Sequence, residues 1–308
     1  MQKYVPEGCL FETPENQSYL RDLRGLLRAS EGGVTLEARA VICDSAHNLY
    51  VDLNGVRGFI PREDAAIGIR DGSVRDVAIL SRVNKPVCFR IVNLVKSSEG
   101  NYEAILSRRL AQEDCLRSFV ERLCPGDVID ARVTHLDSFG AFVDIGCGIP
   151  ALIPIDAISV SRISHPADRF SPGQSIKAIV RDVDLLTRRI TLSHKELLGT
   201  WEENAAAFSP GDTVAGIVRS IESYGIFVEL TPNLAGLAEP KEGVCVGQQA
   251  SVYIKNILPE KMKVKLIIVE SFDTAFSPPP LRYFVQSGTQ KTWVYSPEAC
   301  RKVIESVF

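Results

Sequence analysis

The sequence has 308 residues, of which 45% are hydrophobic and 24% are charged. These fractions are typical of globular proteins, so they exclude a largely disordered chain, and the length predicts two or three domains. The 35 basic and 38 acidic residues leave a net charge of −3, so no overall positive field favours nucleic acid.

Uncharged apolar runs in this sequence are all shorter than the roughly 18 residues that a membrane span needs. The first 15 residues include three glutamates and lack the unbroken apolar core of a signal peptide. We therefore expect a soluble, cytoplasmic protein with no membrane partner. The eight cysteines are scattered without a C-x-x-C pair, which favours buried free thiols over a metal site.

The first 30 residues predict a helical arm. Thr13 followed by Pro14 is a typical cap and first-turn pair for a helix. One face of this helix carries apolar side chains, namely Tyr19, Leu20, Leu23, Leu26 and Leu27. We expect the arm to pack onto the domain that follows it, with docking onto a partner as the alternative.

An internal repeat organises residues 31–270. The segment 125–128 is echoed at 210–213 and the segment 139–144 at 224–229, both at an offset of 85 residues. A fainter third copy lies upstream, in segments 47–53 and 58–61. Because two motifs share one offset, we predict three repeated units, at 31–110, 125–194 and 210–270.

The middle unit contains five short runs rich in β-branched or aromatic residues, at 128–135, 139–145, 151–155, 175–183 and 189–193. Val143 and Ile145 alternate with Phe142 and Asp144, which predicts one buried face and one wet face. A closed five-stranded barrel fits best, because closure removes exposed sheet edges. The sequence therefore predicts a mainly β protein with three tandem barrels, joined by amphipathic linker helices at 111–124 and 195–209.

The last segment, 271–308, has no counterpart in the repeat. Residues 282–295 predict a hairpin around Ser287 and Gly288, and residues 297–307 predict a closing helix. We expect a small C-terminal hairpin-helix extension.

The order and spacing of several motifs in the middle unit resemble the repeat of ribosomal protein S-one. These motifs are residues 126–128, 138–144, 164–168 and 172–174, Asp184, residues 189–195, and a tryptophan-bearing linker at 199–202. The resemblance implies three tandem OB-fold barrels, the first of them degenerate. It also implies that RNA lies across a sheet face and contacts two aromatics, a histidine, an aspartate and an arginine.

Phe139 and Phe142 hold the two aromatic positions in the middle unit. Residues three apart lie on opposite faces of a regular strand, so displaying both rings to one ligand requires a twist or bulge, which Gly140 can supply. Exposed rings there would offer bases a stacking surface. In the alternative, one ring fills the end of the barrel. We expect Phe142 to be at the surface, because Asp144 shares its strand face.

The resemblance carries further residues of the middle unit over. Asp184 matches the family aspartate and Arg189 the family arginine, with Arg188 as a second cation beside it. An exposed loop ion pair is the alternative for these residues. Pro154 stands where the family has histidine, so one stacking group is missing, and we expect His165 to be structural.

In the third unit, Tyr224 and Phe227 hold the aromatic positions. Lysines that could follow a phosphate backbone stand at and around the arginine position, namely Lys261, Lys263 and Lys265. Glu239 replaces the histidine and Leu258 the aspartate, so we rank this unit second.

The first unit keeps only the outline of the motif. His47 and Tyr50 hold the aromatic positions, Pro61 replaces the histidine, and Ser98 and Glu103 fall at the aspartate and arginine positions. We expect its RNA face to be eroded and its role to be that of a spacer or docking unit.

Three functions follow as hypotheses. The first is a non-catalytic protein that binds single-stranded RNA such as mRNA in translation, in contact with the small ribosomal subunit. The second is a ribosome- or polymerase-associated protein-binding scaffold with eroded RNA contacts. An enzyme is disfavoured, because the sequence has four histidines, no acidic cluster at metal-binding spacing and no phosphate-binding glycine loop. We expect no cofactor and no small-molecule substrate.

Overall fold

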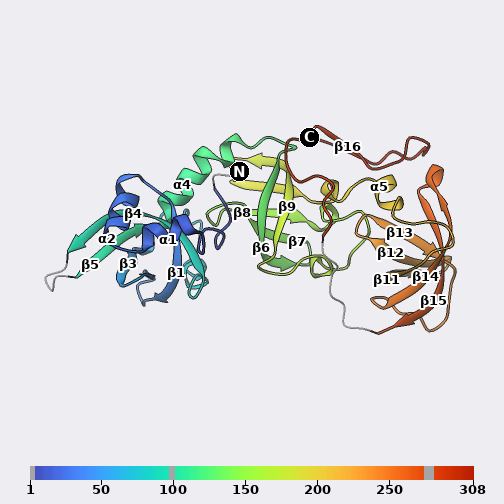
Figure 1. Cartoon of the computed structure of the whole chain (residues 1–308), viewed down its shortest axis with the longest axis horizontal. Helices are drawn as coiled ribbons and strands as arrows, with labels where there is room; N and C mark the ends of the chain where they lie inside the picture. The colour runs from blue at the N-terminus through green and yellow to red at the C-terminus, as the bar shows by residue number, and fades with distance from the viewer. Residues whose placement is uncertain (1–3, 97–100, 274–280) are drawn as a thin grey trace. The chain divides into compact units, whose positions relative to one another are not determined.

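The computed structural model describes residues 4–96, 101–273 and 281–308. It is mainly β and contains three closed barrels of five strands each, as the repeat predicted (Figure 1). The chain divides into two units, residues 1–123 with 144–150, and residues 124–143 with 151–308. Among the described residues, no helix is long and apolar enough to cross a membrane. Ser98 lies outside the described residues.

The first unit holds the first barrel, whose strands follow one another in the order β1-β2-β3-β5-β4. Its elements are α1 Pro14–Leu20, α2 Leu23–Glu31, β1 Leu36–Cys43, β2 Leu49–Leu53, β3 Val56–Ile60, η1 Arg62–Asp64, α3 Val77–Leu80, β4 Pro86–Lys96, β5 Tyr102–Ser107, α4 Arg108–Ser118 and η2 Val120–Arg122. The inward side chains of these strands form one core with Leu20, Leu26 and Ala29 of the arm.

The N-terminal arm is two helices rather than one. Thr13 caps α1 as predicted, accepting a hydrogen bond from the Asn16 N–H, and Asp22 caps α2 through the Gly25 N–H. The chain turns sharply between them, and a Cβ on Gly25 would lie 2.3 Å from the Tyr19 carbonyl oxygen. Because of this break, Leu27 is 43% exposed, so the single apolar face predicted for the arm is wrong at that residue.

A buried ion pair ties the N-terminal segment to helix α4. Nε of Arg108 lies 2.7 Å from Oε1 of Glu7 and Nη2 lies 2.9 Å from Oε2. The Glu7 N–H donates to the Asp144 carboxylate, which also accepts from the Gly146 and Gly148 N–H groups. Burial and the nearby Glu7 raise the pKa of Asp144. The expectation that Asp144 faces water is therefore wrong, since its buried carboxylate accepts hydrogen bonds from backbone N–H groups.

The second unit holds the other two barrels, with strand orders β10-β8-β7-β6-β9 and β11-β12-β13-β15-β14. The elements after η2 are β6 Val128–Asp137, β7 Gly140–Asp144, β8 Pro150–Pro154, η3 Ile155–Ala157, η4 Pro166–Asp168, β9 Ser175–Asp184, β10 Arg189–Ser193, η5 Lys195–Leu198, α5 Trp201–Ala205, β11 Thr213–Glu222, β12 Gly225–Thr231, β13 Leu234–Ala238, β14 Gln249–Leu258, η6 Pro259–Lys261, β15 Lys263–Phe272, β16 Thr292–Val294 and β17 Glu305–Val307.

The two predicted linkers form as short helical segments. The first consists of α4, which Ser107 caps, and η2. The second consists of η5 and α5, and Thr200 and Glu203 form a capping box at the start of α5. Trp201 is 2% exposed and packs in the core of the third barrel, so this linker belongs to that barrel.

The C-terminal segment forms a small strand hairpin, as predicted, but from other residues than expected and without the predicted helix. Residues 297–307 form no helix, and β16 pairs instead with β17 as an antiparallel ladder. Residues 282–295 do not close on themselves as a hairpin, because Thr289 bridges to Asp127 and the Gln290 N–H donates to the Gly126 carbonyl. Trp293 and Tyr295 are buried in the core of the third barrel. Long-range packing therefore overrides the local helix signal.

The second and third barrels are joined by buried polar contacts within the second unit. The Ser161 N–H donates to the Pro232 carbonyl at 3.1 Å, and the Val160 N–H donates to Oδ1 of Asn233 at 3.0 Å. Nη2 of Arg169 lies 2.5 Å from Oε2 of Glu229, with both side chains less than 5% exposed. These contacts fix how the two barrels face each other.

The eight cysteines are free thiols, but only some of them are buried. Cys88, Cys115 and Cys147 are buried in the first unit, whereas Cys9, Cys124 and Cys245 are exposed. The expectation of buried thiols is therefore wrong for the exposed three. No group of three or more His, Cys, Asp or Glu side chains within the described ranges is arranged to hold a metal ion.

Candidate nucleic-acid interface

The second barrel brings Phe139 and Phe142 together at its surface. Phe139 lies in the turn before β7 and Phe142 in the middle of β7, with ring centroids 5.7 Å apart and planes perpendicular. Phe139 is 51% exposed and Phe142 is half-buried. Phe142 is thus the less exposed ring, and Asp144, which was expected to share an outer strand face with it, is buried.

Gly140 allows this placement of the two rings. A Cβ at this position would lie 2.5 Å from the Ile153 carbonyl oxygen of β8, so only glycine lets the start of β7 lie this close to its neighbour. The Ile155 N–H donates to the Phe139 carbonyl at 3.0 Å, which holds the turn against the end of β8. The two rings therefore share one side of the barrel although they are three residues apart.

His135 completes an aromatic cluster that the sequence motif did not reveal. It is exposed near the end of β6, and its ring lies 6.3 Å from that of Phe142 at an interplanar angle of 26°. It supplies an aromatic group beside Phe142, although Pro154 occupies the family's histidine position. The sequence signal that could have found it is a histidine at the end of the strand that pairs with β7.

Asp184, Arg188 and Arg189 lie at the β9–β10 turn. Asp184 accepts hydrogen bonds from the Leu186 and Thr187 N–H groups and from the Thr187 hydroxyl, and the bonds from Thr187 hold its pKa below its usual range. Arg189 is exposed and lies opposite Asp184 across the two strands. Arg188 is exposed and adopts a positive φ of 54°. Strand β10 lies two strands from β7 in the barrel order.

The third barrel repeats the aromatic arrangement. The ring centroids of Tyr224 and Phe227 lie 6.2 Å apart with perpendicular planes. Tyr224 lies in the turn before β12 and is 64% exposed, and Phe227 is half-buried. The two pairs occupy positions 85 residues apart in the chain, and in both an exposed outer ring makes an edge-to-face contact with a half-buried inner ring.

The three lysines of the third barrel are exposed on and beside β15. Phe227 pairs with Leu237 on β13, and Leu237 pairs with Lys265 on β15, so these side chains share one face of the sheet. Lys263 lies two residues before Lys265 on the same face, and Lys261 ends η6. Glu239, at the family's histidine position, is exposed 3.4 Å from Nζ of Lys255.

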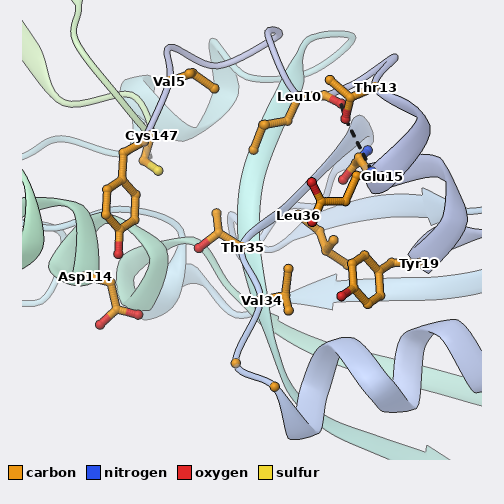
Figure 2. A pocket seen from close by; sticks show the side chains of 14 residues that line it. Val5, Leu10, Thr13, Glu15, Tyr19, Val34, Thr35, Leu36, Asp114 and Cys147 are labelled. Carbon is orange, nitrogen blue, oxygen red and sulfur yellow. Dashed lines mark hydrogen bonds between the residues drawn. The ribbon is translucent and has the colours of Figure 1, made fainter. Parts of the chain in front are cut away.

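His165 has the structural role predicted for it. Its Nδ1 accepts a hydrogen bond from the Ala167 N–H, and the Asp168 carboxylate accepts from the His165 N–H, which together cap η4. A pocket of about 420 Å³ lies in the first unit, and Figure 2 shows Thr13, Tyr19 and Asp114 among the residues that line it. None of the ten predicted RNA-contacting residues lines this pocket.

Comparison with known proteins identifies the repeat. Residues 123–195 match the family described as S1 RNA binding domain. Small ribosomal subunit protein bS1 of Leuconostoc lactis is 30% identical over 251 residues, covering 76% of this chain and 56% of the relative. The Bacillus cereus bS1 homolog is 33% identical over 240 residues, covering 73% and 60%, and Staphylococcus aureus bS1 is 31% identical over 282 residues, covering 86% and 67%.

The chain thus spans little more than half of the first two relatives and two thirds of the third. The match to the third relative extends over most of this chain, well beyond the middle barrel. Together with three tandem five-stranded barrels, this similarity shows that the chain belongs to the bS1 family of small ribosomal subunit proteins.

Proposed function

We propose that this protein is a non-catalytic, cytoplasmic RNA-binding protein of translation that holds single-stranded RNA, such as mRNA, on its second and third barrels. The observation that carries the proposal is the recurrence of one perpendicular aromatic pair, Phe139 with Phe142 and Tyr224 with Phe227. Membership of the bS1 family supports a contact with the small ribosomal subunit, as do the relatives' names.

The geometry of each pair suits base stacking. The outer rings, Phe139 and Tyr224, are at least half exposed, so they contribute little to the barrel cores. An edge-to-face contact leaves ring faces open to a ligand, and each stacked base contributes about 1–3 kcal/mol regardless of sequence. His135 would add a further surface beside Phe142.

Cations stand at a suitable distance from the rings to meet phosphates. Lys265 lies two strands from Phe227 on one face, and strands are spaced by about 4.8 Å, so the separation is about 10 Å. Arg189 lies on β10, which is likewise two strands from β7. A strand of RNA crossing the sheet can therefore stack its bases on the rings and turn its phosphates toward the cations.

The buried joint between the second and third barrels favours continuous binding. Because the contacts of Arg169 with Glu229 and of Val160 with Asn233 hold the barrels together, RNA bound at one barrel meets the other at a fixed position. Two linked sites bind a long strand more tightly than either site binds a short one. We therefore propose that one RNA strand runs continuously over both barrels.

Fluorescence anisotropy with a fluorescein-labelled uridine RNA of about 12 nucleotides tests the proposal, at low salt and at about 0.15 M salt. The Phe139→Ala/Phe142→Ala variant should bind about 5- to 150-fold more weakly, and so should the Tyr224→Ala/Phe227→Ala variant. Tyr102→Ala removes an exposed ring of the first barrel and should leave affinity unchanged. No binding at low salt, or unchanged affinity in both double variants, would reject the function.

A further inference from the structure

The first barrel carries an aromatic pair of a different kind. Tyr50 of β2 and Phe59 of β3 pair across the two strands, with ring centroids 5.4 Å apart. In the other barrels Leu152 and Leu237 occupy the place of Phe59, and the aromatic pair joins a strand residue to a residue of the preceding turn. This barrel therefore has a second ring, Phe59, beside its strand aromatic, at a position that is aliphatic in its neighbours.

A guanidinium group already lies on this surface. Cζ of Arg57 is 4.2 Å from the centroid of the Tyr50 ring, and Nε of Arg57 is 3.8 Å from Oε1 of Glu103. The Tyr50 hydroxyl donates to Asp44 at 3.2 Å, and Asp52 lies opposite Arg57 across β2 and β3. Aromatic faces framed by carboxylates attract cations, and a planar guanidinium stacks on them especially well.

The charge at the edge of this surface is reversed relative to the other barrels. Phe59 pairs with Ile105, as Leu237 pairs with Lys265 and Leu152 with Thr191. The residue two positions before this partner on its strand is Glu103 in the first barrel, Arg189 in the second and Lys263 in the third. The first barrel thus has a carboxylate where the other two have a cation. A phosphate backbone requires cations, so this face favours a positively charged ligand.

We define the Tyr50 platform as Tyr50, Phe59, Arg57, Asp44, Asp52 and Glu103. It holds three carboxylates and one cation, and the next cation along the chain, Arg62, is paired with Asp76 at 2.8 Å. We propose that the platform binds an arginine-bearing basic segment of a protein partner, and that Arg57 covers the Tyr50 ring until an arginine of the partner replaces it. The proposal is independent of RNA binding by the other barrels.

The sign of one substitution distinguishes a protein ligand from RNA. If Arg57 competes with the partner, Arg57→Ala frees the ring and raises affinity for an arginine peptide. If the platform bound RNA, Arg57 would contact phosphate or base, so Arg57→Ala would lower affinity for RNA. Both Arg57 and Glu103 are more than 40% exposed, so substitutions at these positions should leave the fold intact.

The experiment uses the full chain with a fluorescein-labelled hexa-arginine peptide, a hexa-lysine peptide of equal charge, and the uridine RNA. Arg57→Ala should bind hexa-arginine about 2- to 5-fold more tightly, which corresponds to an exposed cation–π contact. Glu103→Gln should bind hexa-arginine about 1.5- to 5-fold more weakly. The control Glu31→Gln, which removes an exposed carboxylate from α2, should leave the affinity for hexa-arginine unchanged. Hexa-lysine should bind more weakly than hexa-arginine, because it lacks the planar group.

Tyr50→Leu/Phe59→Leu should lose the preference for arginine over lysine, with the melting temperature measured to verify folding. Hexa-arginine affinity that falls or stays constant in Arg57→Ala would overturn the proposal. So would a loss of RNA affinity in Arg57→Ala at constant peptide affinity, which would make the platform a third RNA face.

Discussion

The hydroxyl of Tyr283 lies 3.1 Å from Nε2 of His194, inside the second unit. Nδ1 of the same ring lies 2.9 Å from the Ile158 carbonyl, which can only accept, so Nδ1 carries the proton and Nε2 accepts from Tyr283. The Tyr283 oxygen accepts in turn from the Lys177 N–H at 3.1 Å. A neutral, buried histidine thereby connects the C-terminal segment to the second barrel.

This histidine makes the second unit sensitive to acid. Burial lowers the pKa of His194 to about 4, from 6.5 in an unfolded chain. Between these values the unfolded chain binds more protons than the folded one, so the free energy of unfolding falls as the pH falls. We expect the titration of His194 to lower the free energy of unfolding by about 2 kcal/mol between pH 7 and pH 5.

Urea denaturation followed by tryptophan fluorescence measures this effect at both pH values. Trp201 and Trp293, the two tryptophans of the chain, are buried in the second unit and report on it alone. His194→Gln removes the titrating group. The free energy of unfolding of this variant should therefore fall less between pH 7 and pH 5 than that of the wild type. Equal losses in both proteins would contradict the assignment.

Gly140→Ala should damage both folding and RNA binding. The added Cβ would meet the Ile153 carbonyl oxygen, and relief of the clash would separate β7 from β8 at the point that positions Phe139. We expect a loss of about 1–3 kcal/mol in the free energy of unfolding, together with weaker binding of the uridine RNA. Ser138→Ala, an exposed change in the same turn, serves as the control and should affect neither quantity.

The lysines of the third barrel should govern the salt dependence of RNA binding. For single strands, each phosphate neutralised adds about 0.7 to the slope of log affinity against log salt. Replacing Lys261, Lys263 and Lys265 with alanine should therefore reduce the slope by about 2. A control variant with the same change in net charge replaces Lys291, Arg301 and Lys302, which are exposed in the C-terminal segment. Equal slopes in the two variants would show that the three lysines do not contact the RNA.

Glu229→Gln should weaken the joint between the second and third barrels. Glu229 accepts from Arg169 at 2.5 Å and from Nε of Arg219 at 2.7 Å, and Nη1 of Arg219 lies 3.2 Å from Asp168. The substitution leaves the buried charge of Arg169 without its carboxylate partner, which costs about 3–5 kcal/mol. Urea denaturation measures the loss, and Glu222→Gln, an exposed change on β11, should be neutral. A Glu229→Gln protein as stable as the wild type would refute the role of the pair.

The repeat predicted the three barrels well, because hairpins form from residues near in sequence and the motifs recur at a constant offset. Register and long-range packing were harder to predict. His135 was missed because its contact with Phe142 lies between strands, and Asp144 was placed outward because strand alternation takes no account of the glycine N–H groups that bind it. The expected helix at 297–307 failed because Trp293 and Tyr295 pack into a distant barrel.

The C-terminal segment also has a consequence for the order of events during synthesis. Tyr283 bonds to the second barrel, and Trp293 and Tyr295 complete the core of the third, with the Tyr295 hydroxyl donating to the Asn233 carbonyl at 2.5 Å. Neither barrel can therefore reach its final packing on a growing chain until residues 283–295 have left the exit tunnel. Until then, nascent barrels expose the apolar surface that this segment later covers. The second unit therefore completes its folding late in synthesis.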